Sequence, residues 1–355
     1  MSVNPVPPLP TPARGATSNP PNRFEPLVLE RDADWDPTDD PGSRTHFYRD
    51  LTTSILSHND SPDVGFDVSV NPYRGCEHGC IYCYARPTHE FLGFSAGLDF
   101  ETKIMVKERA AELLRAELSS PKWRPQVIAL SGVTDCYQLV ERRLQLTRQC
   151  LAVLAEFRNP VGIVTKNHLV TRDLDLLGEL ARHQAASVWI SVTTLDPDLR
   201  RVMEPRTSPP SARLAAIREL SQAGIPTGVL VAPVIPGLTD HELPGILAAA
   251  AEAGARFASY VTLRLPLGVA PLFERWLAEH YPDRQEKILN RIRSMREGKL
   301  NESGFGDRMR GHGIFAEQLS QMFHVARRRA GLESDSPALS TASFRPPGGV
   351  QLPLL

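Results

Sequence analysis

Three cysteines crowded into one short loop constrain this chain more than any other feature. Residues 71–86 read N-P-Y-R-G-C-E-H-G-C-I-Y-C-Y-A-R and space Cys76, Cys80 and Cys83 as C-x3-C-x2-C. Three thiolates this close together can face one inorganic centre, and thiolate is the soft ligand that iron–sulfur clusters require. A four-iron cluster held by three cysteines keeps one iron without a protein ligand, where a small molecule can bind. The spacing therefore predicts an open iron–sulfur site.

A structural zinc site is the main alternative. Closed zinc sites need four ligands, usually as two separated pairs. A fourth ligand could come from His78, His89, Cys136 or Cys150, but the sequence has no second C-x2-C and no paired Cys/His motif. Disulfides fit less well, because the five cysteines are odd in number and we expect no secretory signal. The competing class is therefore a non-catalytic zinc or iron–sulfur knuckle that binds nucleic acid or a protein partner.

The rest of the chain divides into a folded centre and two termini of different composition. Residues 1–59 are rich in proline, glycine and acidic side chains, and residues 332–355 in serine and proline. Neither can bury enough apolar area to offset the entropy of ordering, so both are predicted to be mostly disordered. We expect a core over 60–280 and a basic helical extension over 281–331. No run approaches the roughly 20 apolar residues of a membrane span, and we expect a cytoplasmic protein.

Apolar patterns within the core alternate between strands and helices. Strands are predicted at 64–70, 126–130, 161–165, 187–194, 228–234 and 257–263. Helices are predicted at 84–92, 106–118, 141–157, 171–181 (N-capped by Thr171), from 211, and at 240–253. Six strands alternating with helices predict right-handed βαβ units and a parallel sheet. With polar residues at the strand ends, the predicted fold class is α/β, an open, partial (β/α)6 barrel.

Polar residues follow four of these strands at the point where each strand ends. A turn or capping role would explain any one of them. Because the carboxyl ends of parallel strands meet at one edge of a sheet, four such sets together favour a pocket. The set comprises Ser131, Thr134 and Asp135 after the second strand, Lys166 after the third, Ser191, Thr193 and Thr194 at the fourth, and Val234 in the turn 233–240 after the fifth.

The cysteine spacing resembles the signature of the radical S-adenosylmethionine (radical SAM) superfamily, including the aromatic residue, here Tyr82, just before the third cysteine. This resemblance implies a [4Fe–4S] cluster whose open iron chelates the amino and carboxylate groups of SAM. An electron from a donor such as flavodoxin or ferredoxin then splits SAM into methionine and a 5′-deoxyadenosyl radical. The resemblance also implies that the second strand end contacts the SAM amino group, the fourth its ribose or carboxylate, and the fifth its adenine.

A second resemblance concerns the branch of that superfamily. The Thr-Asp at 134–135, with Glu204-Pro205-Arg206 after the fourth strand, is similar to the spore photoproduct lyase branch, including relatives labelled "DNA repair photolyase". Ser-Gly-Val-Thr-Asp replaces the Gly-Gly-Glu that many superfamily members carry. The lyase has a hydrogen-donor cysteine shortly before the matching Asp, whereas Cys136 follows it here, and a one-residue shift reverses the face of a strand. Cys136 is therefore either a hydrogen donor or an inert buried thiol. Glu204 and Arg206 are expected to form an ion pair that positions SAM or orders the loop.

Two further features concern partners, and each has a plain alternative. Residues 284–329 carry eleven Lys and Arg against five Asp and Glu, a net charge of +6 that suits DNA or RNA; the alternative is a solvated helical face. The last five residues, Gln351 to Leu355, resemble the peptides by which bacterial repair proteins bind the sliding clamp; the alternative is an incidental apolar end. We therefore expect a lyase-like radical SAM enzyme that abstracts hydrogen from an unidentified substrate, with nucleic acid as a candidate.

Overall fold

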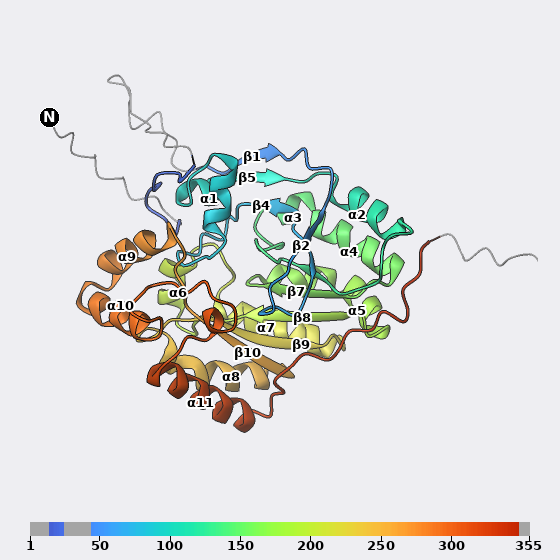
Figure 1. Cartoon of the computed structure of the whole chain (residues 1–355). Helices are drawn as coiled ribbons and strands as arrows, with labels where there is room; N and C mark the ends of the chain where they lie inside the picture. The colour runs from blue at the N-terminus through green and yellow to red at the C-terminus, as the bar shows by residue number, and fades with distance from the viewer. Residues whose placement is uncertain (1–13, 25–43, 348–355) are drawn as a thin grey trace, which may run out of the picture.

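The computed structural model describes residues 14–24 and 44–347, and its centre is an open sheet of seven strands (Figure 1). The strand order is β10-β9-β8-β7-β6-β3-β2; β2 (Leu56–His58) pairs antiparallel with β3, and the other neighbours pair parallel. The parallel strands are β3 (Val68–Val70), β6 (Ile128–Leu130), β7 (Val161–Thr165), β8 (Ala186–Ser191), β9 (Thr227–Val234) and β10 (Phe257–Thr262). Among these strands β10 and β3 do not pair, so the predicted open, partial (β/α)6 barrel is confirmed.

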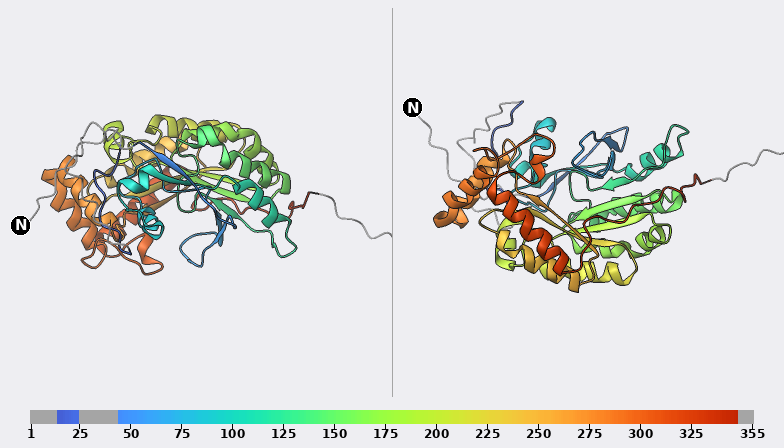
Figure 2. Two further views of the ribbon diagram at one scale, coloured as in Figure 1. Left: turned by 90° about the horizontal axis from the view of Figure 1, so that it is seen from above. Right: turned by 60° about the horizontal axis from the view of Figure 1, so that its bottom comes forward.

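Helices that follow the strands cover one face of this sheet (Figure 2). They are α2 (Ala110–Ser119), α4 (Leu146–Phe157), α5 (Leu174–Arg182), α7 (Pro210–Gln222) and α8 (Leu243–Glu252). Alternate strand side chains such as Val188, Ile190 and Val229 are fully buried and pack with apolar helix residues in one core cluster. Burying a side chain of this size stabilises the fold by about 1.5–3 kcal/mol. The opposite face of the sheet is the inner face of the partial barrel.

Several predicted helices differ from the structure at their beginnings. The helices predicted from 106 and 240 begin at Ala110 and Leu243. The helix predicted over 141–157 is divided into α3 (Glu141–Leu144) and α4, because Gln145 has a left-handed φ of 54°. The helix predicted from Thr171 is preceded by the 3-10 helix η2 (His168–Asp173). Its N-cap is Asn167, whose Oδ1 accepts a backbone amide at 3.0 Å. Thr171 is therefore wrong as the N-cap, since the Asn167 side chain already satisfies a free amide of the first turn.

A second sheet of three strands carries the cysteine loop. Its order is β1-β5-β4, with β1 (His46–Arg49) parallel to β5 (Lys103–Val106) and β4 (Tyr73–Arg74) antiparallel to it. β4 runs directly into the cysteine loop, which is followed by the 3-10 helix η1 (Arg86–Leu92) and by α1 (Leu98–Thr102). The sequence did not predict this sheet, because strands of two to four residues are too short to show a period.

Residues 14–24 form a strap across the cysteine loop and η1. The amides of Gly15 and Ala16 donate to the Glu101 carboxylate at 3.1 and 2.8 Å, and Ala16 is fully buried. Further along, Asn22 Nδ2 donates to the carbonyl of Phe94 at 3.0 Å. The prediction of disorder over 1–59 is therefore wrong for the strap, and also for 44–59, which contain β1 and β2. Hydrogen bonds to buried acceptors order the strap although it contains few apolar residues.

The C-terminal part is also ordered further than its composition predicts. After α9 (Val269–His280), the predicted extension contains α10 (Gln285–Ser294) and α11 (Ile314–Arg329), which lies against α8. Beyond it the amides of Ser340 and Arg345 donate to the carbonyls of Gln184 and Phe157, both at 2.9 Å. The prediction of disorder over 332–355 is therefore wrong as far as residue 347, and residues 351–355 lie outside the described residues. No helix within the described ranges has both the length and the apolarity to cross a membrane.

A polar clasp fastens the open side of the barrel. Asp63, between β2 and β3, accepts a hydrogen bond from Gly306 N at 2.6 Å and pairs with the Arg308 guanidinium. The loop that carries Arg308 is anchored at the end of β10, where Thr262 Oγ1 donates to the carbonyl of Arg310 at 3.1 Å. The clasp therefore joins two ends of the sheet that strand pairing leaves apart.

We predict that Gly15→Ala releases the strap. A Cβ at this position would lie 1.7 Å from Gly79 O, a backbone atom that cannot easily move aside. Overpacking of this kind costs about 1–3 kcal/mol, so trypsin should cut after Arg14 and Arg23 several times faster than in the native protein.

The matched control is Gly178→Ala in α5, because nothing lies within 4 Å of the added Cβ. This variant should leave tryptic cleavage of the strap unchanged and raise the free energy of unfolding by about 0.5–1 kcal/mol. Equal cleavage rates for Gly15→Ala and the native protein would show that the strap does not depend on this close contact.

Candidate functional site

The cysteine loop brings its three thiols into one neighbourhood. Cys83 contacts the apolar groups around both Cys76 and Cys80, and none of the three forms a disulfide. A turn closes the second half of the loop, with Cys83 N donating to the Cys80 carbonyl at 3.2 Å. Gly79 has a φ of 67°, and a Cβ there would lie 2.6 Å from Glu101 Oε2. The turn between the first two cysteines therefore requires glycine.

The donor set fits an iron–sulfur cluster better than a single metal ion. Within the described residues no three His, Cys, Asp or Glu side chains converge as a zinc ion would need. A four-iron cluster instead takes its thiolates on different irons. Burial raises the pKa of all three thiols, while the cations of Arg86 and Lys166 oppose this rise at Cys83. Zinc and iron–sulfur clusters both bind cysteine as thiolate, so what disfavours zinc is the lack of a converging ligand set for one ion among the described residues.

The two remaining cysteines lie in a different part of the protein. Cys136 and Cys150 are fully buried in the core cluster between the sheet and its helices. The Cys136 carbonyl accepts a hydrogen bond from Thr147 Oγ1 at 2.6 Å, and burial raises the pKa of its thiol. Of the two interpretations of Cys136, this position supports the inert core thiol and gives no support to a hydrogen donor.

Lys166 joins the ends of three parallel strands. It follows β7, and its ammonium donates to Ser191 Oγ at 2.7 Å, to Thr193 Oγ1 at 3.0 Å and to the Ala232 carbonyl at 2.8 Å. These three bonds use every proton of the ammonium group. The structure thus brings together Lys166, Ser191 and Thr193, which the sequence analysis assigned to one pocket. Their contact with SAM stays a prediction.

Glu204 is a fully buried carboxylate at the centre of this group. It pairs with Arg213 of α7, hydrogen-bonds the Tyr82 hydroxyl of the cysteine loop, and lies 3.2 Å from Lys166 Nζ. Thr193 Oγ1 also donates to it at 2.8 Å. Burial alone would raise the pKa of Glu204, but the charges of Arg213 and Lys166 outweigh it and hold the pKa well below its ordinary value. The carboxylate therefore connects the cysteine loop to the strand ends.

Arg206 contacts the cysteine loop from a different side. Its Nη2 pairs with Glu77 Oε1 at 3.3 Å, and its backbone amide donates to the His78 carbonyl at 3.3 Å. The predicted ion pair between Glu204 and Arg206 is therefore wrong, because α7 brings Arg213 into the buried position instead.

Asp135 ties the second strand end to the third and to the cysteine loop. Its carboxylate accepts from Thr165 Oγ1 and from Lys166 N, both at 2.8 Å. His78 Nδ1 lies 3.4 Å from the same carboxylate, and His78 Nε2 lies 3.2 Å from Asn167 Nδ2. With the Asn167 amide as donor, Nε2 accepts and the ring proton lies on Nδ1, facing Asp135. His78 is therefore engaged with these two residues, although its sequence position allowed it as a fourth metal ligand.

The other predicted SAM contacts use their polar groups within the protein. Ser131 Oγ donates to the Thr134 carbonyl at 2.8 Å, and Thr134 Oγ1 donates to the Tyr73 carbonyl at 2.8 Å. Val234 is buried at the end of β9, where its carbonyl accepts Leu263 N at 2.9 Å. These bonds fix the turns that face the cysteine loop, and a role in SAM binding stays a prediction for each residue.

Sequence reasoning missed a buried ion pair behind the cysteine loop. Arg86 Nη2 pairs with Glu101 Oε1 at 2.6 Å, and neither side chain is exposed. Arg86 Nε also donates to the Cys80 carbonyl at 3.0 Å, and Glu101 is the residue that binds the strap. Breaking such a pair costs about 3–5 kcal/mol. The position of Arg86 beside the cysteine motif marked it as a residue that could tune a cluster, but its partner Glu101 belongs to no motif.

The inner face of the sheet carries an aromatic floor, formed by Trp189 and Phe257. Their rings meet edge-on with centroids 4.6 Å apart. Gly228 is the register partner of both residues, and a Cβ there would lie 2.1 Å from the Phe257 ring. Ser191 follows Trp189 by two residues and points to the same face. Trp189 therefore lies about 6.6 Å along β8 from Ser191, at about 3.3 Å per residue.

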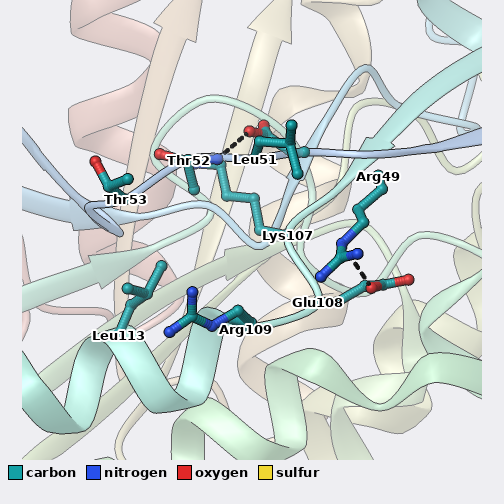
Figure 3. A pocket seen from close by; sticks show the side chains of 9 residues that line it. Arg49, Leu51, Thr52, Thr53, Lys107, Glu108, Arg109 and Leu113 are labelled. Carbon is teal, nitrogen blue, oxygen red and sulfur yellow. Dashed lines mark hydrogen bonds and ion pairs between the residues drawn. The ribbon is translucent and has the colours of Figure 1, made fainter.

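Two cavities lie elsewhere in the protein. One of about 80 Å³ lies between the end of β1 and the start of α2, with Arg49, Lys107 and Glu108 in its lining (Figure 3). The other, of about 310 Å³, is lined by residues of α8 and α11. Neither lining contains a cysteine or any strand-end residue of the candidate site.

Comparison with known proteins assigns the class. The family model of the radical SAM superfamily matches residues 70–250, about half of the chain, so the chain belongs to that superfamily. The family predicted from the cysteine spacing is therefore confirmed.

Individual relatives show which members of the superfamily this chain resembles. The chain is 43% identical over 220 residues to an uncharacterised protein of Mycobacterium tuberculosis (strain ATCC 25618 / H37Rv); the alignment covers 61% of this chain and 65% of the relative, just under two thirds of its length. It is 28% identical over 182 residues to spore photoproduct lyase of Bacillus subtilis (strain 168). That alignment covers 49% of this chain and 48% of the lyase. A structure of spore photoproduct lyase complexed with dinucleoside spore photoproduct matches with a TM-score of 0.59 at 15% identity, covering 87% of both chains. The predicted likeness to the lyase branch is thus confirmed at the level of the fold.

We predict that Glu204→Gln lowers the free energy of unfolding by about 3–5 kcal/mol at pH 7, because Arg213 would stay buried without its counter-charge. The folded-state pKa of Glu204 is depressed, so its stabilisation is complete above its ordinary pKa of 4.5 and is lost as the pH falls below that value. Urea titrations at pH 7 and pH 3.5 measure the free energy of unfolding. The difference in this free energy between the native protein and the variant should be about 1 kcal/mol smaller at pH 3.5.

The control is Glu219→Gln in α7, the helix that carries Arg213, and it changes a half-exposed carboxylate paired with His168. A surface pair contributes about 0–1 kcal/mol, so this variant should unfold close to the native protein at both pH values. A loss at Glu204 no larger than the loss at Glu219 would contradict the central position assigned to the buried carboxylate.

Proposed function

We propose that this protein is a radical SAM enzyme that acts on nucleic acid, with Cys76, Cys80 and Cys83 as the three ligands of a [4Fe–4S] cluster. When bound, the cluster supplies the electron that cleaves SAM into methionine and a 5′-deoxyadenosyl radical, which abstracts hydrogen from the substrate. The observation that carries the proposal is the three-thiol loop, with Cys76 and Cys80 buried, which Tyr82 and Glu204 join to the ends of the parallel strands.

The chain's own residues hold the surroundings of this chemistry rigid. Lys166 and Glu204 fix the ends of β7, β8 and β9 relative to the cysteine loop. Polar groups fixed before substrate arrives stabilise developing charge without reorganisation. We propose that SAM lies between the loop and these strand ends, against the polar set of Ser131, Thr134, Asp135, Ser191, Thr193 and Val234. The aromatic floor below this set excludes water from the reacting groups.

Three observations support nucleic acid as the substrate class. The lyase with a similar fold was solved with a dinucleoside spore photoproduct. Trp189 of the aromatic floor is only partly buried and offers a planar ring on which a base can stack. The Arg264 guanidinium lies 5.1 Å from the ring centre of Tyr84, a half-exposed residue next to Cys83, where it can meet a phosphate. Because Cys136 lies in the helix-side core, the proposal does not include hydrogen donation by that thiol.

The first test concerns the ligand set. Replacing Cys76, Cys80 or Cys83 with Ala should abolish both the iron content of the anaerobically reconstituted protein and its cleavage of SAM to 5′-deoxyadenosine, because three thiolates are the minimum protein set for the cluster. The matched controls are Cys136→Ala and Cys150→Ala, which should keep about four irons per chain. One zinc per chain without SAM cleavage would favour the knuckle alternative. Loss of iron in either control would mean that the ligand set proposed here is wrong.

The second test concerns the substrate class. We predict that Trp189→Leu weakens binding of a fluorescent ten-nucleotide oligo(dT) by about 5- to 150-fold, since stacking on an aromatic ring contributes about 1–3 kcal/mol per base. Fluorescence anisotropy measures this, and SAM binding should be unchanged. The control is Trp123→Leu, which removes a tryptophan bonded to Asn159 Oδ1 ahead of β6. If both variants bind oligo(dT) with equal affinity, the aromatic floor no longer supports nucleic acid as the substrate class.

A further inference from the structure

Strand β1 presents an exposed row of aromatic and basic side chains at the edge of the small sheet. All four of its residues, His46–Arg49, are exposed, and β1 is the outermost strand of the order β1-β5-β4. Phe47 and Tyr48 are 39% and 41% exposed, and the Arg143 guanidinium lies 5.2 Å from the ring centre of Phe47. Single exposed aromatic residues are ordinary on a protein surface, but contiguous groups of them mark interaction sites.

The strap extends this surface over η1. Phe24 stacks on Phe91 with ring centroids 4.9 Å apart, although the two residues are 54% and 73% exposed. Phe94 links them to β1, because its carbonyl accepts the Asn22 amide and its ring lies 6.1 Å from Tyr48. Because successive strand residues point to opposite sides, Phe47 lies with Arg143 on one side of β1, and Tyr48 lies with Phe94 on the other. We call the edge that carries both sides the basic–aromatic face and define it by Phe24, Phe47, Tyr48, Arg49, Phe91 and Arg143.

Charge on this surface is arranged with the cations outward. Arg74 is 45% exposed while its partner Asp50 is 9% exposed, and Arg23 is 35% exposed over a buried Glu90. Arg49 is 63% exposed, and its partner Glu108 is also exposed. A partner that docks here therefore meets mostly guanidinium groups and aromatic rings, which is the composition of protein interfaces that bind acidic surfaces.

A column of packed rings leads from this surface to the cysteine loop. Tyr48 meets Phe94, Phe94 lies 5.3 Å from the His89 ring, and His89 lies 5.6 Å from the Phe100 ring. Phe100 packs against Cys76, and its carbonyl accepts the Cys76 amide at 2.9 Å. The contact is continuous from an exposed tyrosine to a residue that the proposed function makes a cluster ligand.

We propose that the basic–aromatic face is the docking surface for a small acidic one-electron carrier protein, which reduces the cluster through the packed rings. The inference rests on the proposed function, because it needs a cluster on Cys76. The carrier loses one electron and the cluster gains it, and no bond forms or breaks. The ring column favours an electron carrier over nucleic acid, the other polyanion that a basic face can bind.

The test uses flavodoxin in its hydroquinone state as the probe and the reconstituted full-length protein. Stopped-flow bleaching of cluster absorbance under anaerobic conditions measures the rate of reduction, without any need for turnover. In Arg49→Glu with Arg143→Glu, the second-order rate at low ionic strength should fall at least tenfold, because steering by surface charge is lost. Tyr48→Leu, which keeps the charge, should also slow reduction by flavodoxin. Dithionite, a small reductant that needs no docking, should reduce all variants at the native rate.

The matched control is Arg182→Glu with Arg218→Glu on the outer helices α5 and α7, which makes the same change in net charge. In each pair one arginine has a carboxylate partner, Arg49 or Arg182, and the other forms no ion pair with the described residues. It should keep the native rate with flavodoxin, apart from a small effect of overall charge that disappears in 0.15 M salt.

Several results would overturn the inference. Equal flavodoxin rates for the native protein and Arg49→Glu with Arg143→Glu would do so, as would an equal slowing with dithionite. Oligonucleotide binding that is lost in this variant while its reduction stays normal would assign the face to nucleic acid. Residues 25–43, which follow Phe24 directly, carry seven acidic residues and one arginine. If flavodoxin binds only after those acids are neutralised, the face binds this acidic segment of the same chain instead. A protein that takes up no iron would overturn the proposed function as well, whereas the other results leave that function standing.

Discussion

The buried Glu204 carboxylate is the interaction on which the rest of the site depends. An ionised carboxylate without exposed surface is stable only where cations and hydroxyls surround it, and Arg213, Lys166, Thr193 and Tyr82 supply them. These partners come from a helix, two strand ends and the cysteine loop. One charge therefore sets the relative positions of four segments that lie far apart in the sequence, and the thiols are placed against the strand ends as a consequence.

A second buried charge performs the same task behind the cysteine loop. Glu101 binds Arg86, which holds the Cys80 carbonyl, and it also accepts the amides of Gly15 and Ala16 in the strap. The loop is thus held from two sides by two carboxylates, each with a buried arginine. Rigidity at this place suits chemistry in which a reactive radical must meet one hydrogen atom and no other.

The sequence predicted the elements whose signal is local. β7 lies at 161–165 as expected, because a run of apolar residues bounded by turn residues defines a buried strand. The cysteines and Lys166 were found by spacing and by position after a strand. The strap and the small sheet were not predicted, since they depend on long-range bonds to Glu101 and its neighbours. The predicted pairing of Glu204 with Arg206 was wrong for a related reason. It assumed that neighbours in sequence pair, whereas the fold places Arg213 of α7 beside the carboxylate.

The clasp between Asp63 and Arg308 has a consequence for how relatives of this protein can diverge. In a closed barrel, hydrogen bonds between strands fix the circumference, and changing it requires a change of strand number or stagger. Here side chains of two surface loops span the remaining gap. Loops tolerate substitution and insertion far better than paired strands. On the proposed function, a few loop residues could therefore widen or narrow access to the inner face, while the sheet and the thiol loop stay as they are. If the protein acts as proposed, its substrate range could evolve without any change to the radical chemistry.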